Sequence, residues 1–275
     1  MGPAEKRVKP VEEFLQVGDT KIHLLRGGRG QPLVILHGAG GGLGWLPFHE
    51  LMARRFTVLA PVHPGFGASD DPAWLEGVDD LVLFYRDFLD TLGLKQVHLL
   101  GTSLGGWIAA EFAVSHQDRL KSLILVDAAG IHVPGAEMAD LFMMDPPTRA
   151  KTVYHNPAVL AEVLAVQPTP EMLQVELRHR VTVAKLAWDP YFHNPKLRRR
   201  LGRIRVPTLI LWGRHDRLIP NAVGQAYEQA IPGSRLVFIE EAGHAPLREA
   251  PEDCARAITE FLRSQTRRPE RSVRR

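Results

Sequence analysis

Apolar positions in this chain form short runs that alternate with amphipathic stretches. Six runs have the length and composition of buried strands, and they lie at 33–36, 56–60, 97–100, 123–126, 207–212 and 235–239. Helical periodicity occupies the intervals between them, at 46–55, 78–92, 104–113, 222–230 and 252–263. Strands that alternate with helices predict an α/β protein with a mostly parallel central sheet, covered by helices on both faces.

Two segments depart from this alternation. The runs 14–17 and 21–25 are separated by Gly18-Asp19, which predicts an antiparallel hairpin ahead of the parallel strands. Residues 131–200 contain helical patterns and several prolines but no buried strand, so we expect an inserted helical cap. The predicted division is therefore an α/β core at 1–130 and 201–263, a cap at 131–200, and a disordered arginine-rich tail at 264–275.

Length and hydrophobic content are sufficient for one large α/β domain with a substantial core. The chain has 275 residues, 45% of them hydrophobic, and a net charge of +3. Much of the basic excess lies in the tail, which we interpret as a solvated end, so we expect no nucleic-acid partner. The single Cys254 excludes an intramolecular disulfide.

The sequence also predicts where the protein resides. The first residues lack the apolar stretch of a secretory signal, and no apolar run approaches the roughly 18 residues of a membrane span. We expect a cytoplasmic protein without a membrane partner, either a monomer or a homodimer.

The segment Gly101-Thr102-Ser103-Leu104-Gly105 is the strongest chemical signal. It joins a buried strand to a helix through a sharp turn that presents the Ser103 hydroxyl at the top of the sheet. Glycine fits at 101 and 105 because a Cβ at either position would crowd the neighbouring strand and helix. A serine hydroxyl is a weak nucleophile, so this interpretation requires a base and an acid elsewhere in the chain.

Asp216 and His244 meet that requirement. Each follows an apolar strand, and the carboxyl ends of parallel strands converge at one edge of a sheet. Ser103 is the predicted nucleophile, His244 the base that takes and returns its proton, and Asp216 the acid that fixes the histidine tautomer. Asp127 also ends a strand and is the reserve candidate for the acid.

The glycine-rich segment 37–42 is the predicted second half of an oxyanion hole. We expect one donor to be the backbone N–H of Leu104 and the other that of Ala39, with Gly40 as the alternative. His37 is expected to order this loop rather than to titrate. The segment lacks the dinucleotide-binding and P-loop patterns, and the chain shows no metal-ligand spacing, so we expect no cofactor and no metal.

Taken together, these motifs resemble the α/β-hydrolase fold superfamily over roughly residues 14–263. The landmarks that carry the resemblance are Leu36-His37-Gly38-Ala39-Gly40, His63-Pro64-Gly65-Phe66-Gly67, the Ser103 motif, Gly213-Arg214-His215-Asp216 and Gly243-His244. The resemblance implies a Ser-His-Asp triad without a cofactor, in a serine esterase- or lactonase-like member with a helical cap.

The expected activity is hydrolysis of carboxylic esters or lactones with small-to-medium apolar acyl groups, through an acyl-Ser103 intermediate. Within the cap, Phe142, Trp188 and Phe192 are expected to line the acyl pocket. The small-molecule ester or lactone is the predicted partner.

Three alternatives remain open. Carbon–carbon bond hydrolases of ring-cleavage products look similar overall but usually carry Asn before the nucleophile and Trp after the histidine, where this chain has Thr102 and Ala245. Cofactor-free perhydrolases share the triad. A ligand receptor on this fold would keep the triad but turn over very slowly.

Overall fold

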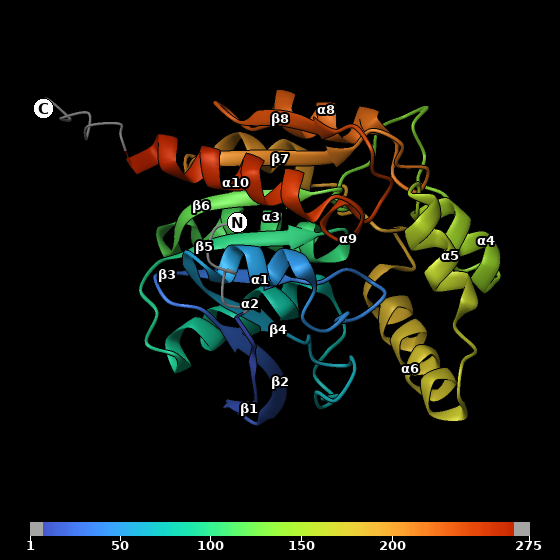
Figure 1. The fold of residues 1–275 in the computed structure, drawn as a ribbon. Helices are drawn as coiled ribbons and strands as arrows, with labels where there is room; N and C mark the ends of the chain where they lie inside the picture. The colour runs from blue at the N-terminus through green and yellow to red at the C-terminus, as the bar shows by residue number, and fades with distance from the viewer. Residues whose placement is uncertain (1–7, 267–275) are drawn as a thin grey trace, which may run out of the picture.

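The computed structural model describes residues 8–266, which are built around one sheet of eight strands in the order β1-β2-β4-β3-β5-β6-β7-β8 (Figure 1). The strands are β1 (Val11–Val17), β2 (Thr20–Gly27), β3 (Gln31–Leu36), β4 (Phe56–Pro61), β5 (Val97–Thr102), β6 (Leu120–Val126), β7 (Thr208–Gly213) and β8 (Arg235–Ile239). From β4 to β8 neighbouring strands are parallel, whereas β2 is antiparallel to both β1 and β4. The predicted hairpin and mostly parallel sheet are thereby confirmed.

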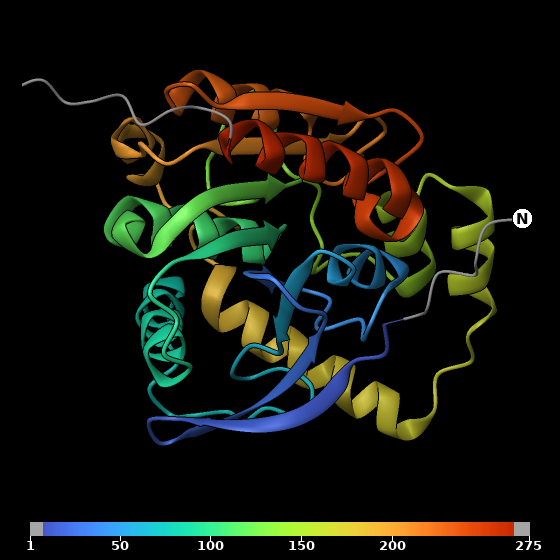
Figure 2. The same ribbon diagram turned by 60° about the vertical axis from the view of Figure 1, so that its left-hand side comes forward.

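Helices cover both faces of the sheet, so that it has a separate apolar core on each side. Helices α2 (Val78–Thr91), α3 (Leu104–His116) and α8 (Asn221–Ala230) pack on one face, around Phe88, Phe112 and Trp212. Helices α1 (Pro47–Ala53) and α10 (Pro251–Thr266) pack on the other. Figure 2 shows α10 lying along that face. Burial on both faces explains why the central strands are almost wholly apolar.

The segment between β6 and β7 forms helices that stand beyond the ends to which the strand arrows point (Figure 1). They are α4 (Pro146–Val153), α5 (Pro157–Ala165) and α6 (Pro170–Ala187), followed by the single turn α7 (Leu197–Arg200). Asp145, Asn156 and Thr169 cap the first three of these helices through their side chains, each directly before a proline. The local sequence thus defines where each of these helices begins.

At the C-terminus, α10 continues to Thr266, past the predicted core boundary at 263. The remainder of the predicted tail, 267–275, lies outside the described residues. Among the helices of residues 8–266, none is long and apolar enough to cross a membrane.

Candidate active site

Ser103 occupies a sharp turn between β5 and α3. Its φ of 53° and ψ of −116° lie in a region that residues other than glycine rarely adopt. A Cβ on Gly101 would come within 2.1 Å of the Gly105 carbonyl oxygen, and one on Gly105 within 2.3 Å of the Leu36 oxygen. The predicted reason for both glycines is therefore confirmed: the turn closes tightly only where no side chains intervene.

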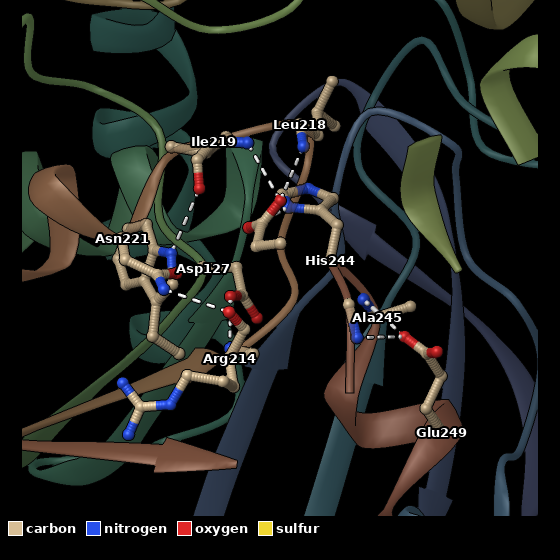
Figure 3. Close-up of polar contacts among 12 residues, drawn as sticks. Asp127, Arg214, Leu218, Ile219, Asn221, His244, Ala245 and Glu249 are labelled. Atoms are coloured by element: carbon tan, nitrogen blue, oxygen red, sulfur yellow. Dashed lines mark hydrogen bonds and ion pairs between the residues drawn. The ribbon is translucent and has the colours of Figure 1, made fainter. Parts of the chain in front are cut away.

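The other two predicted triad residues meet at the same edge of the sheet. The His244 Nδ1 atom lies 2.8 Å from Asp216 Oδ2, and the aspartate side chain is fully buried. The backbone N–H groups of Leu218 and Ile219 donate to Asp216 Oδ1 at 2.8 and 2.9 Å (Figure 3). These donors stabilise the charged carboxylate, which in turn favours the His244 tautomer with its proton on Nδ1 and a free Nε2.

Ser103 and His244 line the same cavity, of about 230 Å³, which we call the catalytic cavity. Ala39 and Gly40, the two predicted oxyanion-hole alternatives, line it as well. Leu104 is the first residue of α3, where a helix leaves backbone N–H groups free for a ligand. The structure thus brings together the predicted nucleophile, base and oxyanion donors, and their catalytic roles are a proposal.

Behind the oxyanion loop, two histidines form a buried network. His37 Nε2 accepts a hydrogen bond from the His63 N–H at 3.0 Å, so its Nδ1 carries the proton and donates to the Gly38 carbonyl. His63 Nε2 contacts the His37 carbonyl at 2.9 Å, and its Nδ1 is hydrogen-bonded to the Tyr85 hydroxyl. Burial holds the pKa of His37 well below 6.5 and lowers that of His63 to about 4. Both rings are neutral near pH 7 and hold the loop in place.

We expect the free energy of unfolding to fall in mild acid, because several histidines are buried. Burial lowers the pKa of His49, His63 and His98 from 6.5 to about 4. Between these values the unfolded chain binds more protons, so stability is full above pH 6.5 and falls as the pH drops toward 4. A fully buried ring contributes up to about 3 kcal/mol to this loss. Urea unfolding at several pH values from about 7 to about 5 tests this expectation. The His98→Gln variant should show a free energy of unfolding that depends less on pH. A stability independent of pH in this window would contradict the expectation.

Helix α6 is tied to the loops beside the catalytic cavity. His179 Nε2 accepts a hydrogen bond from the Gly67 N–H at 2.8 Å, and a Cβ on Gly41 would lie 2.4 Å from the His179 ring. The Thr182 hydroxyl donates to the Gly65 carbonyl at 2.8 Å. Sequence reasoning missed these residues because their partners lie more than 100 positions away in the chain.

Glu249, in the short helix α9 (Pro246–Glu249), joins the segment before α5 to the catalytic histidine loop. Its Oε2 accepts hydrogen bonds from the backbone N–H groups of His155 and Asn156 at 2.6 and 2.7 Å. Its Oε1 accepts one from the Gly243 N–H at 2.9 Å, on the side of the histidine loop that Figure 3 shows. The His244 N–H donates to the Val153 carbonyl at 2.7 Å. One buried carboxylate therefore joins the histidine loop to the segment that precedes α5.

We expect Glu249→Gln to lower kcat about tenfold, because an amide nitrogen cannot accept the N–H groups that one carboxylate oxygen now accepts. The small displacement of the loop moves His244 relative to Ser103. Steady-state kinetics and thermal unfolding measure the effect, with the exposed Glu252→Gln as a matched control. A Glu249→Gln variant with the wild-type kcat would show that this carboxylate does not position the histidine.

The three predicted pocket residues occupy different places. Phe142 lines a second cavity of about 480 Å³ between α6 and the oxyanion loop, together with Ala39 and Gly40. Trp188 is 61% exposed and contacts the edge of Phe142, whereas Phe192 is 2% exposed within the core. The expectation for Trp188 and Phe192 is corrected: Trp188 faces outward and Phe192 lies in the core, so neither belongs to the described lining of the catalytic cavity.

The structure also distinguishes the two candidates for the catalytic acid, Asp127 and Asp216. Asp127 follows β6 and lies beside Asp216, but it is Asp216 that binds the histidine. One potential ligand atom each from Asp127, Asp216 and His244 lies within 4.8 Å of the others, a grouping that could hold a metal ion. The Asp216 oxygens already accept three N–H donors, so this geometry is that of a hydrogen-bonded triad.

A strained serine at a strand–helix turn, followed in chain order by an acid and a histidine at later strand ends, defines a hydrolase site on a parallel sheet. A sequence profile of the Alpha/beta hydrolase family matches residues 33–257. The chain belongs to this family, and it is a hydrolytic enzyme.

Individual relatives span nearly the whole chain. A 2-hydroxy-6-oxononadienedioate/2-hydroxy-6-oxononatrienedioate hydrolase of Burkholderia vietnamiensis is 30% identical, over 94% of this chain and 95% of its own. The solved structure of a bacterial membrane phospholipase A superposes with a TM-score of 0.75 at 27% identity, over 94% and 87%. A 2-hydroxy-6-oxo-6-phenylhexa-2,4-dienoate hydrolase of a Rhodococcus species superposes at 0.77, with 22% identity over 93% and 99%, and supports the fold.

Proposed function

We propose that this protein is a serine hydrolase that cleaves a carbon–carbon bond beside a ketone in a small keto acid. The observation that carries the proposal is the nearly full-length similarity to a hydrolase whose name describes a hydroxy-oxo-dienedioate substrate. This differs from the ester hydrolysis expected from the sequence, although both reactions begin with attack of Ser103 on a carbonyl carbon.

The charge of the catalytic cavity agrees with an acidic substrate. Arg149 and Arg248 belong to its lining, and none of the described lining residues is an aspartate or glutamate. Arg149 is half-buried and pairs with Glu176 at 2.6 Å from the side of α6. A guanidinium presents several N–H donors in a fixed plane, so Arg149 can hold Glu176 and a substrate carboxylate together.

The proposed reaction has two halves, the formation of acyl-Ser103 and its hydrolysis, and His244 transfers protons in both. Ser103 Oγ attacks the ketone carbon while His244 Nε2 takes its proton, and the N–H groups of Leu104 and Ala39 receive the oxyanion. The carbon–carbon bond then breaks, and the departing carbon keeps the electron pair, spread over the conjugated acid, and takes the proton from His244. Water, deprotonated by His244, finally hydrolyses acyl-Ser103 to release the second carboxylic acid.

Ester or lactone hydrolysis is the second candidate, favoured by two residues beside the triad. The resemblance to carbon–carbon hydrolases predicts Asn and Trp at positions where this chain has Thr102 and Ala245, both of which line the catalytic cavity. Ala245 leaves room that a Trp ring would fill. An ester needs no such residue, because its alkoxide leaves with less assistance than a carbanion.

A substrate panel separates the two candidates. Initial rates would be measured on p-nitrophenyl esters of increasing chain length, a lactone and a dienone ring-cleavage acid, for the wild type and Ser103→Ala. We expect the highest Ser103-dependent kcat/KM on the dienone acid, and Arg149→Met should raise its KM more than that of its methyl ester. Fast ester turnover with a negligible rate on the dienone acid would overturn the proposal in favour of the second candidate.

A further inference from the structure

Asp127 is a buried carboxyl group that the proposed mechanism leaves unused. It follows β6 at 1% exposure, with a φ of 44° that is unfavourable for most residues. Its Oδ1 accepts a hydrogen bond from the Gly213 N–H at 2.8 Å, whereas its Oδ2 is buried and, within the described residues, has no hydrogen-bond partner. A buried carboxylate oxygen without a donor is costly, so this atom needs an explanation.

The side chains around Asp127 explain how this buried oxygen is tolerated. Asp127, Asp216 and His244 each place one ligand atom within 4.8 Å of the other two. Two carboxylates this close in a buried site do not both ionise, so one of them holds a proton. Asp216 accepts hydrogen bonds from two backbone N–H groups and from the His244 ring, whereas Asp127 accepts one from a single N–H group, so Asp127 is the carboxyl that holds the proton.

Other ionisable groups near Asp127 also favour its protonated form. Burial is the largest cause that raises the pKa of Asp127, and the nearby Asp216 and Glu249 raise it further, whereas the hydrogen bond from the Gly213 N–H lowers it. The Cys254 thiol is also nearby, and its own pKa is raised by burial. The His244 ring is part of the same group of side chains, and its Nδ1 is hydrogen-bonded to Asp216 at 2.8 Å.

We propose that Asp127 is a positioning residue of the triad: as an uncharged acid it donates the hydrogen bond of its Oδ2 proton to Asp216, and it can ionise in place of Asp216 when that charge is removed. The proposal rests on the proposed Ser103-His244-Asp216 triad. A purely structural Asp127, linking the end of β6 to Gly213, would support the active site equally whether or not Asp216 is charged.

A double-mutant cycle distinguishes these roles. Its readout is the labelling rate of Ser103 by a fluorophosphonate, which forms an Oγ–P bond, expels fluoride and passes the serine proton to His244, without need of the natural substrate. We expect Asp127→Asn to slow labelling by less than about threefold in the wild type, but by at least about tenfold in the Asp216→Asn background. The rate of Asp216→Asn should also rise with pH as Asp127 ionises, and the double variant should lose that rise.

Equal effects of Asp127→Asn in both backgrounds would overturn the proposal and leave Asp127 a structural link. Asp127→Ser, which cannot ionise, repeats the cycle if the Asn variant does not fold. A wild type that is labelled no faster than Ser103→Ala would instead overturn the triad itself, so the two failures are distinguishable.

Discussion

Ser103→Ala is expected to lower kcat/KM by at least about 10³-fold while the protein remains folded. The reaction begins with a bond from Ser103 Oγ to the substrate carbonyl, and Ser103 is held in the strained conformation of the turn, in the same cavity as His244. Alanine retains the Cβ, so the strained backbone and its hydrogen bonds from Trp107 and Ala129 to the Ser103 carbonyl are kept. Initial rates on the best substrate of the panel measure the loss.

A matched control uses Ser115, which lies on the same helix with an exposed side chain bonded to the Glu111 carbonyl. Ser115→Ala should keep the wild-type rate, and thermal unfolding should show both variants folded. More than about a tenth of the wild-type rate in Ser103→Ala would remove the serine from the mechanism.

Asp216→Asn should lower kcat by roughly 10³- to 10⁴-fold. An amide at this position presents N–H groups to His244 Nδ1, which then becomes the acceptor and places the ring proton on Nε2. In that tautomer Nε2 cannot take the serine proton. The expected KM changes little, because Asp216 is buried behind the histidine and does not line the catalytic cavity.

The exposed Asp118→Asn provides the control for charge removal at a distance, and it should leave kcat unchanged. Kinetics of both variants would be compared with their thermal unfolding. A mild Asp216→Asn together with a severe Asp127→Asn would show that the catalytic acid had been assigned to the wrong aspartate.

Local sequence patterns were sufficient to predict the sheet, the hairpin and the convergence of Ser103, Asp216 and His244. Buried parallel strands are continuous apolar runs, and their carboxyl ends lie at one edge of the sheet, so residues after three such runs had to approach one another. The glycines on either side of Ser103 indicated a tight turn, and the structure shows the contacts that exclude a side chain there.

The burial of individual residues in 131–200 could not be predicted in the same way, because it depends on contacts between residues distant in the sequence. Phe192 and Trp188 are both large apolar residues in one segment, yet one is buried and the other exposed. The sequence around Glu249 does not indicate that its carboxylate accepts hydrogen bonds from N–H groups of the segment before α5 and of the histidine loop. The buried state of Asp127 likewise follows from strand packing and not from its own sequence context.

A nucleophilic Ser103 activated by His244 should become acylated during turnover. Rapid quenching of the wild-type protein with p-nitrophenyl acetate, followed by peptide mass spectrometry, measures this acylation. We expect one acetyl group on the peptide that contains Ser103, and no acetylation of that peptide in Ser103→Ala. Acetylation at another residue, at a rate that matches turnover and persists in Ser103→Ala, would contradict this expectation.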